Sequence, residues 1–119
     1  MEDNFKKAVS FVLKHEGGYV VHSNGPGGET KFGISKMTYP HIDIKNLSED
    51  EAREIYYSDY WLKAGCDAME WPTCLVVFDT AVNMGLGRAQ EFKAKALNWT
   101  DYLFLRIEHY NKLAYNPAK

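Results

Sequence analysis

The chain has 119 residues, a length that predicts one domain with a hydrophobic core of its own. A hydrophobic fraction of 45% and a charged fraction of 25% are typical of a globular protein and exclude a disordered one. The net charge of -2 gives no basic field, which excludes nucleic acid as the main partner, and no apolar run is long enough for membrane insertion.

The N-terminal segment predicts a helix that ends on a carboxylate. Apolar residues between positions 5 and 13 repeat at helical spacing. Glu16 lies four residues beyond Val12, so it falls on the same apolar face, and Gly17 and Gly18 then end the helix. A carboxylate therefore stands where an apolar side chain is expected.

The segment that follows predicts a small β hairpin. Residues 19–21 and 31–34 have no helical period and read as two short strands. The glycine-rich link at 24–28 is typical of the turn between them.

The rest of the chain predicts helices. Ser48 and Glu51 form a capping box that opens a helix ending near Trp61. Residues 71–84 are apolar nearly all round, which indicates a central buried helix. A shorter helix at about 88–97 follows, and Thr100 is expected to cap a last amphipathic helix. The fold class is therefore mainly α with a small β hairpin lobe.

The cysteines and histidines indicate no metal site. Cys66 and Cys74 are the only cysteines, and the alternatives are one disulfide between them or, as we prefer for a reducing compartment, two free and partly buried thiols. Because there is no second cysteine pair and no cluster of histidines, we expect no metal and no cofactor.

The position of Glu16 suggests acid catalysis. Loss of hydration on an apolar face and the negative end of the helix dipole both disfavour an ionised carboxylate. The resulting rise in pKa suits a general acid, most often one that protonates a glycosidic oxygen. The alternative from the pattern alone is an ordinary solvated glutamate at a helix end.

Four blocks carry a resemblance to a known family. The segments "KHEGGYV", "PGGETKFGIS", "AREIYYSDYW" and "VFDTAVNMGLGRA" resemble, in family order, the N-acetylmuramidases of glycoside hydrolase family 108. These are lysozyme-like endolysins of phages and prophages. The resemblance implies a lysozyme-like helical domain with a small β lobe. It also implies cleavage of the β-1,4 bond between N-acetylmuramic acid and N-acetylglucosamine in peptidoglycan glycan strands.

The resemblance also implies roles for single residues. Glu16 is the expected catalytic acid, and Thr30 is expected to hold the attacking water or contact a sugar, although its hydroxyl could equally serve local hydrogen bonding. Tyr19, Asn24 and Asn83 are the expected substrate-binding residues. Asp79 and Glu29 are interpreted differently, Asp79 as part of a polar network that ties the lobes together and Glu29 as solvent-facing.

Two departures from the family pattern leave a second function open. Family members usually carry an acidic residue before Pro-Gly-Gly, where this chain has Gly25. We expect residues 1–97 to form the catalytic domain, and residues 98–119 to resemble only the first helix of a longer peptidoglycan-binding module, packed in the same domain. The alternative is a catalytically weakened peptidoglycan-binding or virion structural module with the same fold.

The expected location follows from the N-terminus and the resemblance together. Residues 1–5 are acidic and lack the apolar core of a signal peptide. We therefore expect the protein in the host bacterial cytoplasm before its release to the cell wall, in a holin-dependent context, or associated with the virion.

Overall fold

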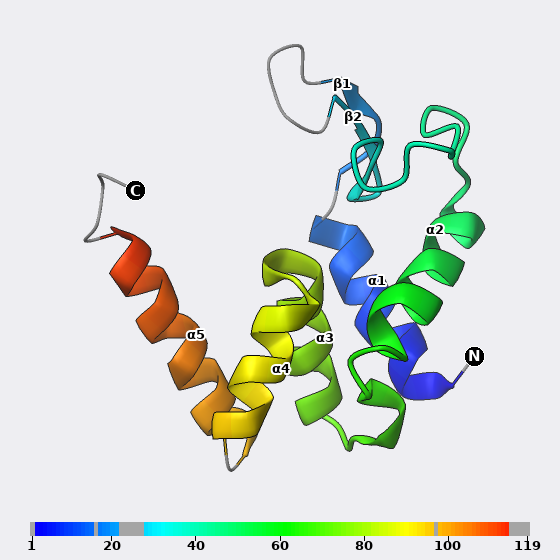
Figure 1. The fold of residues 1–119 in the computed structure, drawn as a ribbon. Coiled ribbons are helices and arrows are strands. Elements are labelled where there is room, and N and C mark those ends of the chain that lie inside the picture. The colour runs from blue at the N-terminus through cyan, green and yellow to red at the C-terminus, as the bar shows by residue number, and fades with distance from the viewer. Residues whose placement is uncertain (1, 16, 22–27, 97, 115–119) are drawn as a thin grey trace.

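The structure, a computed structural model, describes residues 2–15, 17–21, 28–96 and 98–114. It combines helices with one small antiparallel sheet, which confirms the predicted fold class (Figure 1). In chain order the helical elements are α1 Asp3–His15, α2 Glu49–Tyr56, the π-helix η1 Tyr57–Trp61, the 3₁₀-helix η2 Cys66–Ala68, α3 Thr73–Met84, α4 Leu86–Lys95 and α5 Trp99–Ala114.

The sheet has three strands, β1 Val20–Val21, β2 Glu29–Lys31 and β3 Ile34–Ser35, in the order β1-β2-β3. The predicted continuous strand over 31–34 is wrong, because the chain reverses at Phe32 and Gly33. Their φ angles of 52° and 78° are those that a tight hairpin turn needs at both central positions. The predicted hairpin is therefore one part of a three-stranded β lobe, which we define as residues 17–21 and 28–47.

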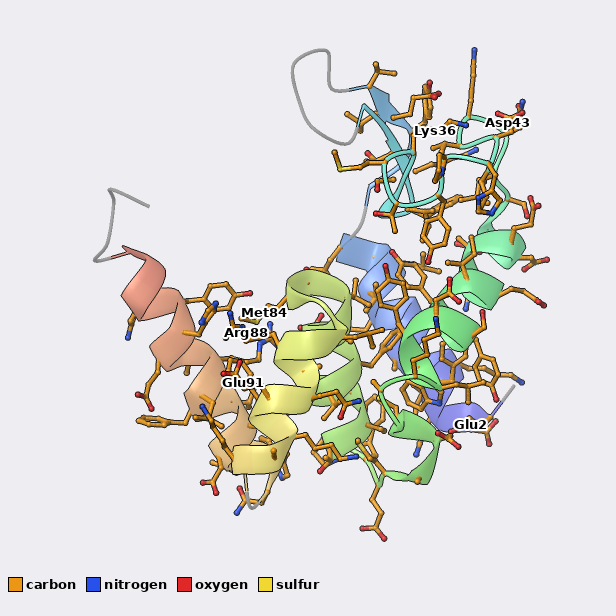
Figure 2. The ribbon with its side chains drawn as sticks, viewed as in Figure 1. Glu2, Lys36, Asp43, Met84, Arg88 and Glu91 are labelled. Atoms are coloured by element: carbon orange, nitrogen blue, oxygen red, sulfur yellow. The ribbon has the colours of Figure 1, made fainter. Side chains whose placement is uncertain are left out.

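The loop that completes the β lobe is held by its own side chains. The Lys36 Nζ donates a hydrogen bond to the Ile42 carbonyl at 2.7 Å. The Asn46 amide donates to the Asp43 carboxylate at 2.7 Å, and this bond lowers the pKa of Asp43. Lys36 and Asp43 lie together at the far end of the lobe from the helices (Figure 2).

The helical core is built around three aromatic rings. Phe5 of α1, Trp61 of η1 and Phe78 of α3 are fully buried and meet edge to face, with ring centroids 5.4 to 5.9 Å apart. The predicted central helix is confirmed, since α3 packs against α1 on one side and against α4 and α5 on the other. Burial of these rings fixes the first turn of α1 against η1 and α3.

The helix starts confirm one predicted cap and correct another. Ser48 and Glu51 form the predicted capping box, with hydrogen bonds of 2.9 and 3.1 Å. The prediction that Thr100 caps the last helix is wrong, because the Asn98 side chain accepts the hydrogen bond from the Asp101 amide at 3.0 Å and α5 begins at Trp99. Asparagine is the better cap, since its carbonyl reaches the third helical amide.

Cys66 and Cys74 are free and buried, as predicted. Burial raises the pKa of the Cys66 thiol to about 12, which keeps it in the unreactive neutral form. Among the described residues, no helix combines the length and the apolar character needed to span a membrane.

Candidate active site

The C-terminal end of α1 meets the β lobe (Figure 1). Glu16 itself lies outside the described residues, next in sequence to His15, the last residue of α1. On its other side, the Gly17 carbonyl accepts a hydrogen bond from the Phe32 amide at 3.0 Å. The segment that carries the predicted acid is therefore anchored to α1 before it and to the β2–β3 turn after it.

Phe32 joins three parts of the molecule. Its φ of 52° is uncommon for a residue with a large side chain, so surrounding contacts must hold it there. One contact is the hydrogen bond to Gly17, and the other is the Tyr56 hydroxyl of α2, which donates to the Phe32 carbonyl at 2.6 Å. These two bonds connect the residue after Glu16, the β lobe and α2.

We expect Tyr56→Phe to lower the free energy of unfolding by about 1 to 2 kcal/mol. The change removes the hydroxyl that binds the Phe32 carbonyl and leaves this carbonyl without its donor in a part-buried position. Urea denaturation of both proteins measures the difference. Tyr19→Phe is the matched control, because it removes a hydroxyl from an exposed hydrogen bond. If the two variants unfold at the same urea concentration, the hydrogen bond from Tyr56 to Phe32 stabilises the fold no more than an exposed hydrogen bond does.

Thr30, the second predicted catalytic residue, lies at the centre of the sheet. It is half-buried in β2, where it pairs with Val20 on one side and Ser35 on the other. Thr30 thus lies two residues before Phe32, whose amide binds the Gly17 carbonyl. Whether Thr30 contacts a sugar or water stays a prediction.

Tyr19 and Glu29 bind each other. The Tyr19 hydroxyl donates to the Glu29 carboxylate at 2.6 Å, and this bond raises the pKa of Tyr19. Our interpretation of Glu29 as solvent-facing is thus incomplete, because the residue is half-buried and its carboxylate accepts a hydrogen bond from the hydroxyl of Tyr19, the residue before β1. Tyr19 keeps an exposed ring, and its predicted substrate role is not tested by this arrangement. Asn24 lies outside the described residues.

Asn83 belongs to a polar group on α3 and α5. Its amide donates to the Asp79 carbonyl at 2.9 Å and to the Asp79 carboxylate at 3.0 Å. The other carboxylate oxygen of Asp79 accepts from Arg106 at 2.9 Å. Asp79 therefore serves in a polar network, but the prediction that this network ties the lobes together is wrong, because its members lie on α3 and α5. Asn83 remains exposed beside it.

We expect Asp79→Ala to destabilise the protein by about 1 to 3 kcal/mol, because the part-buried Arg106 guanidinium loses its partner. Glu91→Ala is the control, since it removes a pair between Arg88 and Glu91 on the more exposed surface of α4. Thermal melts of the two variants and the parent give the comparison. If Glu91→Ala lowers the melting temperature more than Asp79→Ala does, the ion pair between α3 and α5 is not the more stabilising of the two.

A hollow of about 390 Å³ lies between the β lobe and the helices. We call it the interlobe hollow, and its lining residues are Thr38, Tyr39, Asp59, Tyr60, Lys63, Gly85 and Leu86. Three separate parts of the chain form its walls: the loop after β3, the π-helix with the residues that follow it, and the α3–α4 turn. Gly85 makes that turn with a φ of 93°, which disfavours any other residue.

Tyr39 and Asp59 are the polar centre of this hollow. The Tyr39 hydroxyl donates to the Asp59 carboxylate at 2.7 Å. Burial, followed by this bond, raises the pKa of Tyr39 far above its usual value, so the hydroxyl stays a donor at physiological pH. An aromatic ring, a carboxylate and the Lys63 ammonium in one concave surface can bind a polar ring such as a sugar.

Sequence reasoning did not select Tyr39, Asp59 or Lys63 as site residues. Asp59 and Tyr60 do stand in the block "AREIYYSDYW", and the π-helix there is a local distortion that often marks functional sites. None of the residues that line the hollow is one of the predicted site residues. Within the described part of the chain, no group of three or more His, Cys, Asp or Glu side chains could hold a metal ion.

Comparison with protein families gives a match over most of the chain. The model of the family described as glycosyl hydrolase 108 matches residues 9–85, more than half of the chain. The chain belongs to the glycosyl hydrolase 108 family. The matched region contains the end of α1, the β lobe, α2, η1 and α3, and it ends at the turn that closes the interlobe hollow.

A solved structure supports the same family fold. The chain resembles the structure of Brucella abortus SagA with a TM-score of 0.69 and 32% sequence identity. The match covers 77% of this chain and 57% of that chain, so this glycosyl hydrolase 108 protein spans little more than half of the SagA chain. No curated protein matches the chain at comparable significance.

Proposed function

We propose that this protein is an N-acetylmuramidase that cleaves the β-1,4 bond between N-acetylmuramic acid and N-acetylglucosamine in peptidoglycan. The observation that carries the proposal is the family match over residues 9–85, since this family consists of glycoside hydrolases. The region includes Glu16 and Thr30, the two proposed catalytic residues.

Glu16 is the proposed general acid. It follows α1 directly in the sequence, and a helix C-terminus favours the neutral, proton-donating form of a carboxyl group near it. In the proposed reaction the Glu16 carboxyl gives its proton to the glycosidic oxygen as the bond from the anomeric carbon to this oxygen breaks. Water then adds to the anomeric carbon and returns a proton to the enzyme.

Thr30 and the proposed substrate residues position the reactants. The half-buried place of Thr30 in the central strand supports a role for its hydroxyl in holding the attacking water or a sugar. Tyr19, Asn24 and Asn83 remain the proposed sugar contacts, and Tyr39, Asp59 and Lys63 of the interlobe hollow are added to them on the ground of their shared concave surface. The proposed biological role is wall lysis for a phage or prophage, either from the host cytoplasm or from the virion.

A second candidate is a peptidoglycan-binding module with weakened catalysis. It is favoured by one observation, the glycine at position 25 where the family usually has an acidic residue. Loss of that carboxylate removes a group that stabilises the sugar cation or positions water. Binding without cleavage would be its signature.

Analysis of the reducing ends of digested peptidoglycan tests both candidates. Purified peptidoglycan is incubated with the protein, reduced with borohydride and examined by mass spectrometry. New reduced ends on N-acetylmuramic acid support the proposed function, whereas new reduced ends on N-acetylglucosamine contradict the assigned bond. Sedimentation with peptidoglycan in the absence of any new end supports the binding module.

A further inference from the structure

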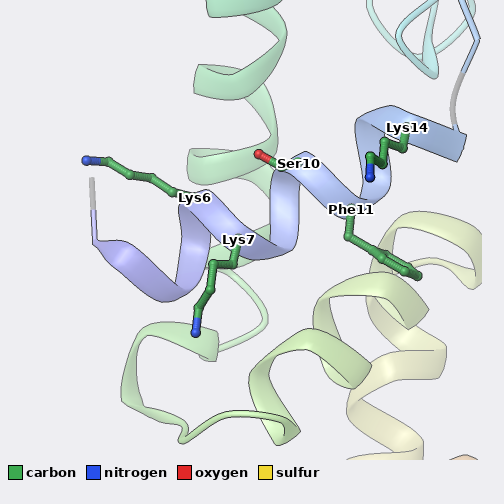
Figure 3. A pocket seen from close by; sticks show the side chains of 5 residues that line it. All are labelled: Lys6, Lys7, Ser10, Phe11 and Lys14. Carbon is green, nitrogen blue, oxygen red and sulfur yellow. The ribbon is translucent and has the colours of Figure 1, made fainter.

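The solvent face of α1 is a lysine-rich surface on a protein of negative net charge. Lys6, Lys7 and Lys14 lie along this face together with Ser10 and Phe11, opposite the residues that α1 buries, and they line a groove of about 520 Å³. Figure 3 looks onto this face, with Lys6 and Lys7 toward one end and Lys14 toward the other. We call these five residues the α1 lysine face.

The charges of this face are not neutralised by neighbours. Among the ion pairs of the described residues, none involves Lys6, Lys7 or Lys14. Asp3 is exposed one turn before Lys6 and Lys7 and forms no ion pair with them in the described structure. Three exposed lysines without an ion pair make this face locally positive, and a positive face attracts an anionic ligand.

The face also offers apolar surface beside the charges. The Phe11 ring is 44% exposed and lies next to the His15 ring at a centroid distance of 4.7 Å. The Lys7 ammonium sits 4.4 Å from the centre of the Trp71 ring, which is 39% exposed. Aromatic contact of this kind holds the ammonium in place while leaving it open to a ligand. The occupant therefore carries both negative charges and small apolar groups.

We propose that the α1 lysine face binds the acidic peptide stems of peptidoglycan, a contact that rests on the proposed function. These stems are short peptides in which free carboxylates alternate with methyl-bearing residues, which matches lysines interleaved with Phe11. Lys6 and Lys14 are about 12 Å apart along the helix axis at the usual rise per residue, a span suited to a short peptide rather than a long polyanion. The negative net charge also disfavours a long polyanion.

The direction of α1 connects this face with the proposed reaction. The stem of peptidoglycan is attached to N-acetylmuramic acid, one of the two sugars at the proposed scissile bond. Lys14 lies in the last turn of α1, and Glu16 follows the helix in sequence. A stem that lies along α1 therefore leads from its sugar at the C-terminal end of the helix toward Lys6.

Sedimentation with chemically defined peptidoglycan tests the proposal. The substrates are phosphate-free peptidoglycan with intact stems, the same material with its stem carboxylates amidated, and glycan strands without stems. The proteins are the parent, Lys6→Gln/Lys14→Gln, and the control Lys45→Gln/Lys95→Gln, which loses the same charge from other exposed positions. Glutamine is chosen because its helix propensity is close to that of lysine.

We expect Lys6→Gln/Lys14→Gln to bind peptidoglycan with intact stems about 5- to 10-fold more weakly than the parent, and the control to bind like the parent. The parent should bind peptidoglycan with amidated stems as weakly as Lys6→Gln/Lys14→Gln binds it. Asp3→Asn, which removes the acidic residue beside the face, should bind intact stems more tightly.

Equal binding of the parent and Lys6→Gln/Lys14→Gln to intact stems would overturn the proposal. A parent that prefers phosphate-bearing wall polymer or anionic lipid vesicles to intact stems would overturn it as well. Cleavage of glycan strands without stems tests the proposed function separately. Lysine-dependent binding without any cleavage would support the α1 lysine face and refute the muramidase assignment.

Discussion

Glu16→Gln is expected to reduce peptidoglycan cleavage by about a thousandfold and to leave the fold intact. A glutamine cannot donate the proton that the leaving glycosidic oxygen needs, and general acid catalysis contributes about 10²- to 10⁴-fold in rate. The loss should appear in kcat, because the neutral amide has nearly the shape of the protonated carboxyl group. Turbidity loss of permeabilised cells gives the rate, and a thermal melt checks the fold.

Glu29→Gln is the matched control for this experiment. It makes the same chemical change at the other glutamate of the segment, whose carboxylate is bound by the Tyr19 hydroxyl. We expect it to retain most of the parent rate, because Glu29 is already occupied within the sheet. If Glu16→Gln lyses cells as fast as the parent, Glu16 is not the general acid. If only Glu29→Gln loses lytic activity, Glu29 is the acid instead.

Gly25→Asp is expected to raise the rate of cleavage. The family usually has an acidic residue before its Pro-Gly-Gly, and a carboxylate near the sugar cation stabilises the transition state by on the order of a few kcal/mol. This energy corresponds to about 10- to 1000-fold in rate. Gly25 lies outside the described residues, so the expectation rests on the sequence. The expected gain requires that the loop accept the side chain, because a glycine beside proline can hold backbone angles that aspartate tolerates poorly.

The rates of parent, Gly25→Asp and Asn24→Ala on one peptidoglycan preparation measure this effect, with melting curves for each protein. A slower Asn24→Ala would show that the Asn24 side chain contributes to cleavage, either as a sugar contact or in place of the carboxylate. If a folded Gly25→Asp is no faster than a parent that already cleaves at lysozyme-like rates, a carboxylate at position 25 is unnecessary in this protein. If neither protein cleaves and both bind, the binding-module alternative is favoured.

Local sequence signals predicted the helical part of the fold well. The capping box of Ser48 and Glu51 and the apolar pattern of α3 are confirmed because both depend on residues within one helix or one turn of it. The resemblance to the family is confirmed by the match over residues 9–85. The role of Asp79 in a polar network was also predictable, since a carboxylate on a buried helix requires a partner.

The tertiary structure decided the features that depend on distant partners. The reversal at Phe32 and Gly33 was missed because the hydrogen bonds from Phe32 to Gly17 and from Tyr56 to Phe32 join it to parts of the chain that are distant in sequence. Tyr39 and Asp59 are separated by 20 positions in the chain, and no pattern along the sequence pairs them. The sequence by itself thus determined the helices, the Ser48 cap and the family, because these arise from neighbouring residues and ordered motifs. Only the folded chain brought Tyr39, Asp59 and Lys63 into one hollow and turned the lysines of α1 outward, because these depend on how the elements pack.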